Sequence, residues 1–71
     1  MTIGDMLKVI EVLAESEKSW EDAASQAVAR ASKSVHGIKS MYIKEMEAKV
    51  DNNKITQYRI NGMISFVLDK K

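Results

Sequence analysis

The stretch GIKSMYIKEMEAKVDNNKITQYRINGMISFVL, residues 37–68, fills almost half of the 71-residue chain and predicts one long β-hairpin. Two runs rich in β-branched and aromatic residues, roughly 38–50 and 54–68, flank the turn DNNK. Asn52 and Asn53 tolerate the positive φ angles of a two-residue hairpin loop. Such a loop fixes which residues lie opposite each other: Asp51 and Lys54, Ile43 and Gly62, and Met41 and Ile64.

This register gives the hairpin two different faces. One is apolar and should cover a helix; it contains Met41, Ile43, Tyr58, Ile60, Gly62, Ile64, Phe66 and Leu68. The other is mostly polar and contains Ser40, Tyr42, Lys44, Met46, Gln57, Arg59, Asn61, Met63 and Ser65. The polar face is either solvated, as is common in antiparallel sheets, or turned towards other subunits and a ligand. Both interpretations stay open.

The apolar positions of the first hairpin strand change phase beyond residue 44. They are odd before it (Met41, Ile43) and even after it (Met46, Ala48, Val50). We interpret this change as a hairpin tip that extends beyond its own helix and meets new neighbours. A hairpin of this length is more than a 71-residue monomer can bury, and the chain has no cysteine for disulfides or a cysteine-based zinc site. Self-association is the expected source of the missing burial.

The first half of the chain predicts a strand followed by a helix. The run MLKVIEVL, residues 6–13, is typical of a strand. The segment SWEDAASQAVARASKSVHG begins with a capping box, in which Ser19 accepts from the Asp22 backbone and the Asp22 carboxylate reaches back. One helical stripe follows, formed by Trp20, Ala23, Ala24, Ala27, Val28, Ala31 and Val35. Gly37 can supply a left-handed stop.

Composition excludes several classes of function. Hydrophobic residues make up 45% of the chain, and 11 basic and 10 acidic side chains are interspersed, so no one-sided basic field points to nucleic acid. The N-terminus has neither the continuous apolar core of a signal peptide nor the ~20 residues of a membrane span. We expect a soluble, cytoplasmic protein, with residues 1–71 forming a single domain and with neither nucleic acid nor membrane as a partner.

Catalysis has little support in the sequence. There is no cysteine nucleophile, the lone His36 lacks an evident orienting acid, and Ser19 is used as a cap. No nucleophile elbow, glycine-rich phosphate loop or zinc-protease motif occurs. The protein is therefore not expected to be an enzyme.

Residues 8–41, KVIEVLAESEKSWEDAASQAVARASKSVHGIKSM, resemble the dodecins, a family of small flavin-binding proteins. The shared elements are S-W-E-D-A and the alanine-rich A-V-x-R-A-S-K, and the likeness continues through YRINGMISF. The resemblance implies an α+β fold of order β-α-β-β, with a three-stranded antiparallel sheet partly wrapped around one helix. It also implies a homo-oligomer, twelve copies forming a hollow shell that binds or stores a small ligand.

The chain departs from the flavin-binding dodecins at two positions. In those relatives a tryptophan stacks on the flavin ring and a glutamine hydrogen-bonds its polar edge; the corresponding residues here are Ser40 and Arg59. Serine offers no aromatic platform, and arginine cannot accept a hydrogen bond from the flavin imide. The resemblance therefore predicts that flavin binding is weak or lost. A subgroup lacking the tryptophan is associated with calcium, so a structural or partner-binding oligomer holding a divalent cation is the alternative.

The site residues follow from the hairpin register and the resemblance. Ser40 and Arg59 share a face but stand six residues apart along the strands, so one ligand can touch both positions only where subunits meet. We predict that Ser40, Tyr42, Arg59 and Asn61 line an intersubunit cavity, with Arg59 pairing with a neighbour's acid or an anionic ligand. Glu45 is the candidate metal ligand, against the alternative of a solvated carboxylate. Trp20 is expected to be a packing residue rather than a flavin platform.

Overall fold

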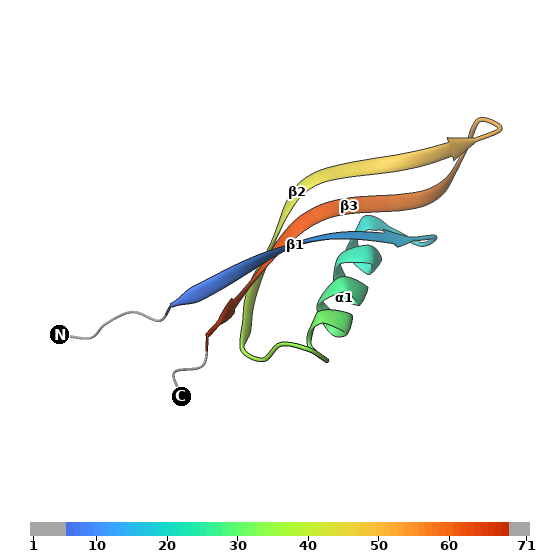
Figure 1. The fold of residues 1–71 in the computed structure, drawn as a ribbon. Coiled ribbons are helices and arrows are strands. Elements are labelled where there is room, and N and C mark those ends of the chain that lie inside the picture. Colours follow the sequence, from blue (N-terminus) through green and yellow to red (C-terminus); the bar gives the residue numbers. More distant parts are fainter. Residues whose placement is uncertain (1–5, 69–71) are drawn as a thin grey trace.

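The computed structural model describes residues 6–68 and contains three strands and one helix. In chain order these are β1 (Leu7–Ser16), α1 (Trp20–Ala31), β2 (Ile38–Asp51) and β3 (Lys54–Val67). Both strand pairs are antiparallel, and the order in the sheet is β1-β3-β2, so β3 is the central strand (Figure 1). The predicted α+β fold of order β-α-β-β is confirmed.

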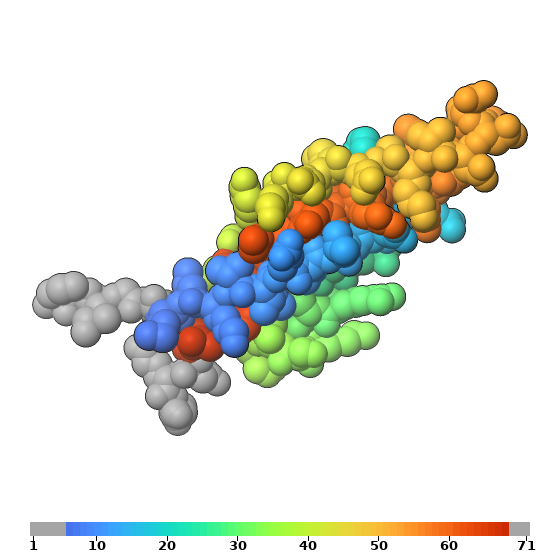
Figure 2. Space-filling model, turned by 45° about the horizontal axis from the view of Figure 1, so that its top comes forward, coloured from blue at the N-terminus to red at the C-terminus, as the bar shows by residue number. Residues whose placement is uncertain are grey.

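The molecule is elongated, because the hairpin of β2 and β3 extends well beyond the helix. The principal dimensions are 57 × 21 × 14 Å, and the radius of gyration is 14.9 Å. A compact chain of this length would have a radius of gyration of about 11 Å. Helix α1 covers one face of the sheet, and the hairpin tip projects past it (Figures 1 and 2). Within residues 6–68, no helix combines the length and the apolar character that crossing a membrane requires.

Strand β1 is longer than the sequence predicts. The apolar run predicted an end at Leu13, but pairing with β3 continues through Glu15 and Ser16. Polar residues extend the strand here because each finds a partner. Glu15 binds Arg59 on β3, and the buried Ser16 hydroxyl donates to the Asp22 carboxylate at 2.6 Å.

At the N-terminus of α1, one of the two hydrogen bonds of the predicted capping box forms. Ser19 accepts from the backbone N–H of Asp22 at 2.9 Å, as expected. The Asp22 carboxylate does not reach back to Ser19; it accepts from Ser16 and from Gln26 Nε2 instead. These two hydrogen bonds lower the pKa of the Asp22 carboxyl. The Ser19 backbone N–H lies 3.4 Å from the Ser16 hydroxyl, which replaces the missing half of the box.

The helix ends earlier than the stripe suggests. It stops at Ala31, and tight turns follow, in which Ser34 and Val35 both donate to the Ala31 carbonyl. Gly37 does have the predicted left-handed conformation, with φ of 71°, but it lies six residues after the helix, where the chain enters β2. The apolar stripe itself is confirmed, since every predicted stripe residue is at least half-buried.

The hairpin turn and most of the predicted register are confirmed. Asn52 and Asn53 have φ angles of 54° and 65°. All three predicted pairs occur: Asp51 with Lys54, Ile43 with Gly62, and Met41 with Ile64. Gly62 permits a close strand approach, because a Cβ there would lie 2.8 Å from the Tyr42 carbonyl oxygen and 2.7 Å from Met41 Cε.

Between these fixed pairs the register differs from the prediction. Thr56 is an extra residue on β3 and Lys44 an extra residue on β2, so two bulges shift the ladder by one residue and then restore it. Met46 consequently pairs with Ile60 and faces the helix side, whereas the regular ladder placed it opposite Arg59 on the polar face. The phase change seen in the sequence marks the bulge at Lys44. The bulges keep Glu45 and Glu47 away from the apolar helix side, where unpaired carboxylates would be costly.

The core lies between α1 and the centre of the sheet. Its buried hydrophobic residues are Ala23 on the helix and Ile60, Ile64 and Phe66 on β3. Since β3 is the central strand, its even-numbered residues lie beneath the helix and between two neighbouring strands. The small Ala23 lets the helix approach the sheet closely, so a single helix suffices to bury this part of β3.

Candidate functional site

The face of the sheet opposite α1, called here the outer face, carries the predicted ligand-binding residues. Paired residues share a face, so the register defines rows of three side chains across β1, β3 and β2. Three of these rows form the centre of the outer face: Glu11–Met63–Tyr42, Leu13–Asn61–Glu45 and Glu15–Arg59–Glu47. No element of residues 6–68 covers this face.

Arg59 is held between two acids of its own chain. Its Nε donates to Glu15 Oε2 at 2.8 Å, Nη2 donates to the same oxygen, and Nη1 lies 3.5 Å from Glu47 Oε1. The hydrogen bond from Arg59 lowers the pKa of the Glu15 carboxyl, and the same bond raises the pKa of Arg59. The guanidinium was expected to need an acid from a neighbour or an anionic ligand. Within one chain it already has two acidic partners, one on each adjacent strand.

A depression of about 470 Å³ lies beside Arg59 on this part of the sheet. Its lining is Leu13, Glu45, Met46, Glu47, Arg59 and Asn61. The Oδ1 atom of Asn61 is buried and has no hydrogen-bond partner among the described residues. The lining of the depression therefore includes two largely exposed glutamates, which are hard oxygen donors, and Asn61, whose unpaired Oδ1 is buried.

One chain does not complete a metal site. Within residues 6–68, no group of three or more acidic or histidine side chains is placed to hold a metal ion. Glu45, the predicted metal ligand, is exposed and pairs across the ladder with Asn61. Further ligands would have to come from water or from another copy of the chain.

Ser40 and Tyr42 lie at a different place on the outer face. The Ser40 hydroxyl is 2.7 Å from that of Ser65, so the two serines bond to each other across the strands. Tyr42 is exposed, opposite Met63. The partners of Ser40 and Glu47, which are Ser65 and Arg59, are six residues apart on β3, roughly 20 Å at ~3.3 Å per residue. The structure thus brings Arg59, Asn61 and Glu45 together, and leaves Ser40 and Tyr42 outside that group.

Trp20 is a packing residue, as predicted. Its ring meets that of Tyr58 edge-to-face, with centroids 4.9 Å apart, and its Nε1 donates to the Glu47 carbonyl at 3.0 Å. Tyr58 belongs to the helix side of β3, so the indole points away from the outer face. These contacts of Trp20 pack the start of α1 against the hairpin.

Sequence reasoning missed Glu15, Glu47 and Leu13 as members of this site. Glu15 was left outside the predicted strand, which ended at Leu13, although its distance of four residues from Glu11 would place both acids on one face of a longer strand. The bulge at Lys44 brings Glu47 to Arg59, and no glycine or proline marks that position. Leu13 could have been found from its odd position in the first strand, because odd-numbered residues of β1 pair with the odd-numbered, outer-face residues of β3.

The fold and the outer face define a small β-α-β-β protein whose sheet is covered by one helix on one side and open on the other. The chain belongs to the dodecin family, because the family model Dodecin matches residues 6–69. It is 41% identical over 59 residues to the calcium dodecin of Mycobacterium tuberculosis, a match that covers 83% of each protein. The predicted family is therefore confirmed.

Solved structures support the same assignment. The crystal structure of the calcium dodecin from M. tuberculosis superposes with a TM-score of 0.78 at 36% identity, covering 93% of this chain and 94% of that one. The tt0972 protein of Thermus thermophilus superposes with a TM-score of 0.88 at 25% identity, covering 96% of this chain and all of the other.

Proposed function

We propose that this protein assembles into a dodecin-type homo-oligomeric shell of twelve copies that binds or stores a small ligand and does not hold it in the standard flavin sandwich. The role is binding rather than catalysis, in the cytoplasm, with neither nucleic acid nor membrane as a partner. The near balance of 11 basic and 10 acidic residues is consistent with this choice of partners.

One observation carries the flavin part of the proposal. At both positions where the resemblance places flavin contacts, the side chain is already engaged within the chain. Ser40 bonds to Ser65, and Arg59 bonds to Glu15 and Glu47. A flavin entering this face would find no aromatic platform at Ser40 and would have to compete with carboxylates for Arg59.

The assembly part rests on burial. The described chain has four buried hydrophobic residues, whereas eight large hydrophobic residues are at least half-exposed: Met6, Leu7, Val9, Leu13, Tyr42, Met46, Val50 and Ile55. A monomer with so small a core is marginal, and contacts with further copies would supply the missing burial.

Two measurements on the purified protein test this proposal. Light scattering should give a mass near twelve subunits, and a monomer or dimer at micromolar concentration would overturn the shell. A riboflavin fluorescence titration should show little quenching. Quenching at micromolar riboflavin would show that flavin binding survives.

A paired substitution tests whether the pocket has the place that the resemblance implies. The variant carrying Ser40→Trp and Arg59→Gln should gain riboflavin quenching as an intact oligomer. The variant carrying Tyr42→Trp and Arg59→Gln is a matched control, because it places a tryptophan on the same face at a different row. An oligomer that stays unable to bind riboflavin after the first pair of changes would mean that the site lies elsewhere.

A second candidate function is divalent-cation binding, favoured by the unpartnered Asn61 Oδ1 beside Glu45 and Glu47. The 41% identity to a protein named calcium dodecin adds to this candidate. Calcium prefers six to eight oxygen ligands, so the donors of one chain would need completion by water or another subunit. Calcium should then raise the melting temperature, and Glu45→Gln should abolish the rise while Glu21→Gln, on the exposed side of the helix, should not. An equal rise in both variants would exclude Glu45 as a ligand.

A further inference from the structure

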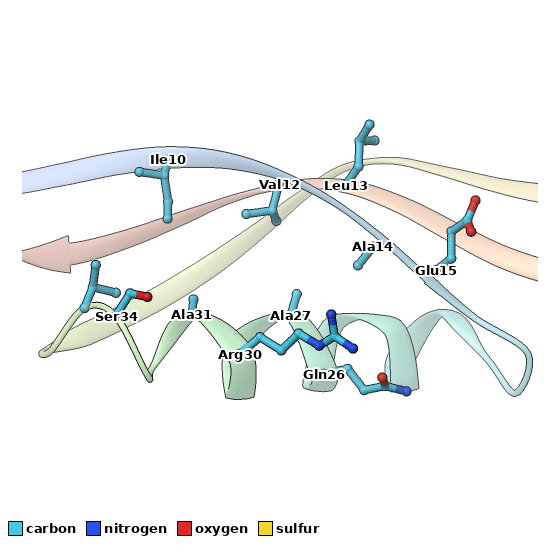
Figure 3. A pocket seen from close by; sticks show the side chains of 11 residues that line it. Ile10, Val12, Leu13, Ala14, Glu15, Gln26, Ala27, Arg30, Ala31 and Ser34 are labelled. Carbon is cyan, nitrogen blue, oxygen red and sulfur yellow. The ribbon is translucent and has the colours of Figure 1, made fainter.

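A groove of about 470 Å³ runs between the edge strand β1 and helix α1, on the side of the sheet away from the outer face. Ile10, Val12 and Ala14 point from β1 towards the helix, and Ala27 and Ala31 point back towards the strand (Figure 3). The facing alanines are too small to fill the space between the two elements. The groove is therefore apolar in its interior, and it opens beside β1, which pairs with β3 on one side and has no neighbouring strand on its other edge within residues 6–68.

The hairpin tip, defined here as residues 46–55, carries exposed apolar side chains that could occupy such a groove. Its apolar side chains Met46, Val50 and Ile55 are 59%, 64% and 51% exposed. Because of the two bulges, all three belong by register to the helix-side face of the hairpin, and Val50 and Ile55 lie next to the turn, in the part that extends past the helix. The tip is a narrow two-stranded ribbon that projects from the body of the molecule (Figure 2). It cannot reach its own groove, because it points away from it.

Charge also matches between the two surfaces. Arg30 is the one cation that lines the groove, and it forms no ion pair with any residue between 6 and 68. Asp51 sits at the end of the tip and is likewise outside every ion pair of the described chain. The one acid that lines the groove, Glu15, is engaged by Arg59.

We propose that the hairpin tip of one copy inserts into the β1–α1 groove of the next copy, with Val50 and Ile55 entering the apolar space and Asp51 facing Arg30. This contact rests on the proposed self-assembly and names the surfaces that make it. One contact would cover both the exposed tip and the open groove. A tip and a groove are different surfaces, so a contact that is not reciprocated between two copies is heterologous; it links copies head to tail and closes into a ring where the rotation between copies closes.

The absence of cysteine makes a direct crosslinking test available, since every thiol will be an introduced one. The test variant carries Val50→Cys in the tip and Ala27→Cys in the groove. The matched control carries Val50→Cys and Ala29→Cys, because Ala29 is an exposed alanine of the same helix that does not line the groove. Both are treated with a short bis-maleimide and separated on a denaturing gel, after light scattering has established that each variant assembles.

A head-to-tail contact should give covalent species larger than dimers in the test variant and at most traces in the control. Dimers alone, already seen with Val50→Cys by itself, would indicate a tip-to-tip contact and overturn this inference. An assembled protein with no difference between test and control would also overturn it, while leaving the proposed shell intact. A protein that is monomeric even without substitutions would overturn both.

A second pair of variants works without crosslinking. Ile55→Asp places a charge where the apolar groove would receive the side chain, and Ser25→Asp makes the same change of charge at an exposed helix position outside both the tip and the groove lining. Dissociation of the oligomer on dilution should move to a concentration about tenfold higher or more for Ile55→Asp, and stay unchanged for Ser25→Asp. Equal behaviour of the two variants would exclude Ile55 from any contact between copies.

Discussion

On the helix side of the sheet, Ile60 and Ile64 have no exposed surface, whereas on the outer face Leu13 and Tyr42 are 69% and 65% exposed. Both faces belong to the same three strands, and both carry large apolar side chains. The two faces differ in exposure because α1 packs on one of them, and no element of residues 6–68 packs on the other. One face therefore stabilises the individual chain, and the other is available for contacts with additional copies or with a ligand.

The largest effect should come from shortening the central core residue. Ile64→Ala removes a fully buried side chain from beneath α1, and we expect a loss of about 2–5 kcal/mol in the free energy of unfolding. Urea unfolding followed by circular dichroism at a fixed protein concentration measures it.

Leu13→Ala is the matched control on the outer face. In a single chain it should cost much less than Ile64→Ala, since most of the Leu13 side chain is in water. A loss as large as that of Ile64→Ala would mean that the assembly buries Leu13, so that the contrast between the faces holds for the single chain and not for the oligomer.

A smaller loss is expected where the two hairpin strands approach each other. In Gly62→Ala the new Cβ would lie 2.8 Å from the Tyr42 carbonyl oxygen, which is backbone and cannot move aside alone, so we expect a cost of about 1–3 kcal/mol. Gly37→Ala is the comparison: it has room for a Cβ but a φ of 71°, and should cost about 1 kcal/mol. Thermal melting of both variants checks the order, and a larger loss for Gly37→Ala would contradict it.

The ion pair between Arg59 and Glu15 on the outer face should make a pH-dependent contribution to the stability of the fold. The folded pKa of Glu15 lies below its usual value, so its contribution is present above the unfolded pKa and is lost as the pH falls through the folded pKa. Glu15→Gln should therefore lower the melting temperature at pH 7, and this difference should shrink as the pH falls below the usual pKa of a glutamate. A difference that persists at acid pH would show that Glu15 acts through packing rather than charge.

The smallest effect is expected for Glu47, the second acid that contacts Arg59. Glu47 Oε1 is 3.5 Å from Arg59 Nη1, and the Glu47 side chain is more exposed than that of Glu15. Glu47→Gln should leave the melting temperature close to that of the parent protein at pH 7. An effect equal to that of Glu15→Gln would mean that the two acids hold Arg59 as one unit.

The sequence was sufficient where local chemistry decides the structure. Two asparagines in a row specify a tight turn, and that turn sets the pairs on which the register depends; Ser19 likewise specified the start of the helix. The end of β1 could not be predicted from its own residues. Glu15 and Ser16 are strand residues because of Arg59 and Asp22, which lie 44 and 6 residues away in the sequence.

The candidate site was predicted in part, for a related reason. The positions of Ser40, Tyr42, Arg59 and Asn61 on one face depend on the turn and were predicted correctly. The neighbours of Arg59 depend on bulges whose residues, Lys44 and Thr56, are ordinary in strands. The change of phase after residue 44 was visible, but a bulge and a hairpin that leaves its helix produce the same pattern, and here both occur.

The paired bulges also mean that the hairpin has a second possible pairing register. The pairs at either side, Val50 with Ile55 and Ile43 with Gly62, would be the same in a ladder without bulges. Only the segment 45–49 would slide, and it would turn over, sending Glu45 and Glu47 under the helix and Met46 outward. The turn is compatible with both registers, so the alternation of acidic and apolar side chains within residues 45–49 determines which register forms. Exchanging the acidic and apolar side chains there should select the other register and keep acids on the outer face, now at positions 46 and 48, with position 46 opposite Arg59, while both ends of the hairpin stay in place.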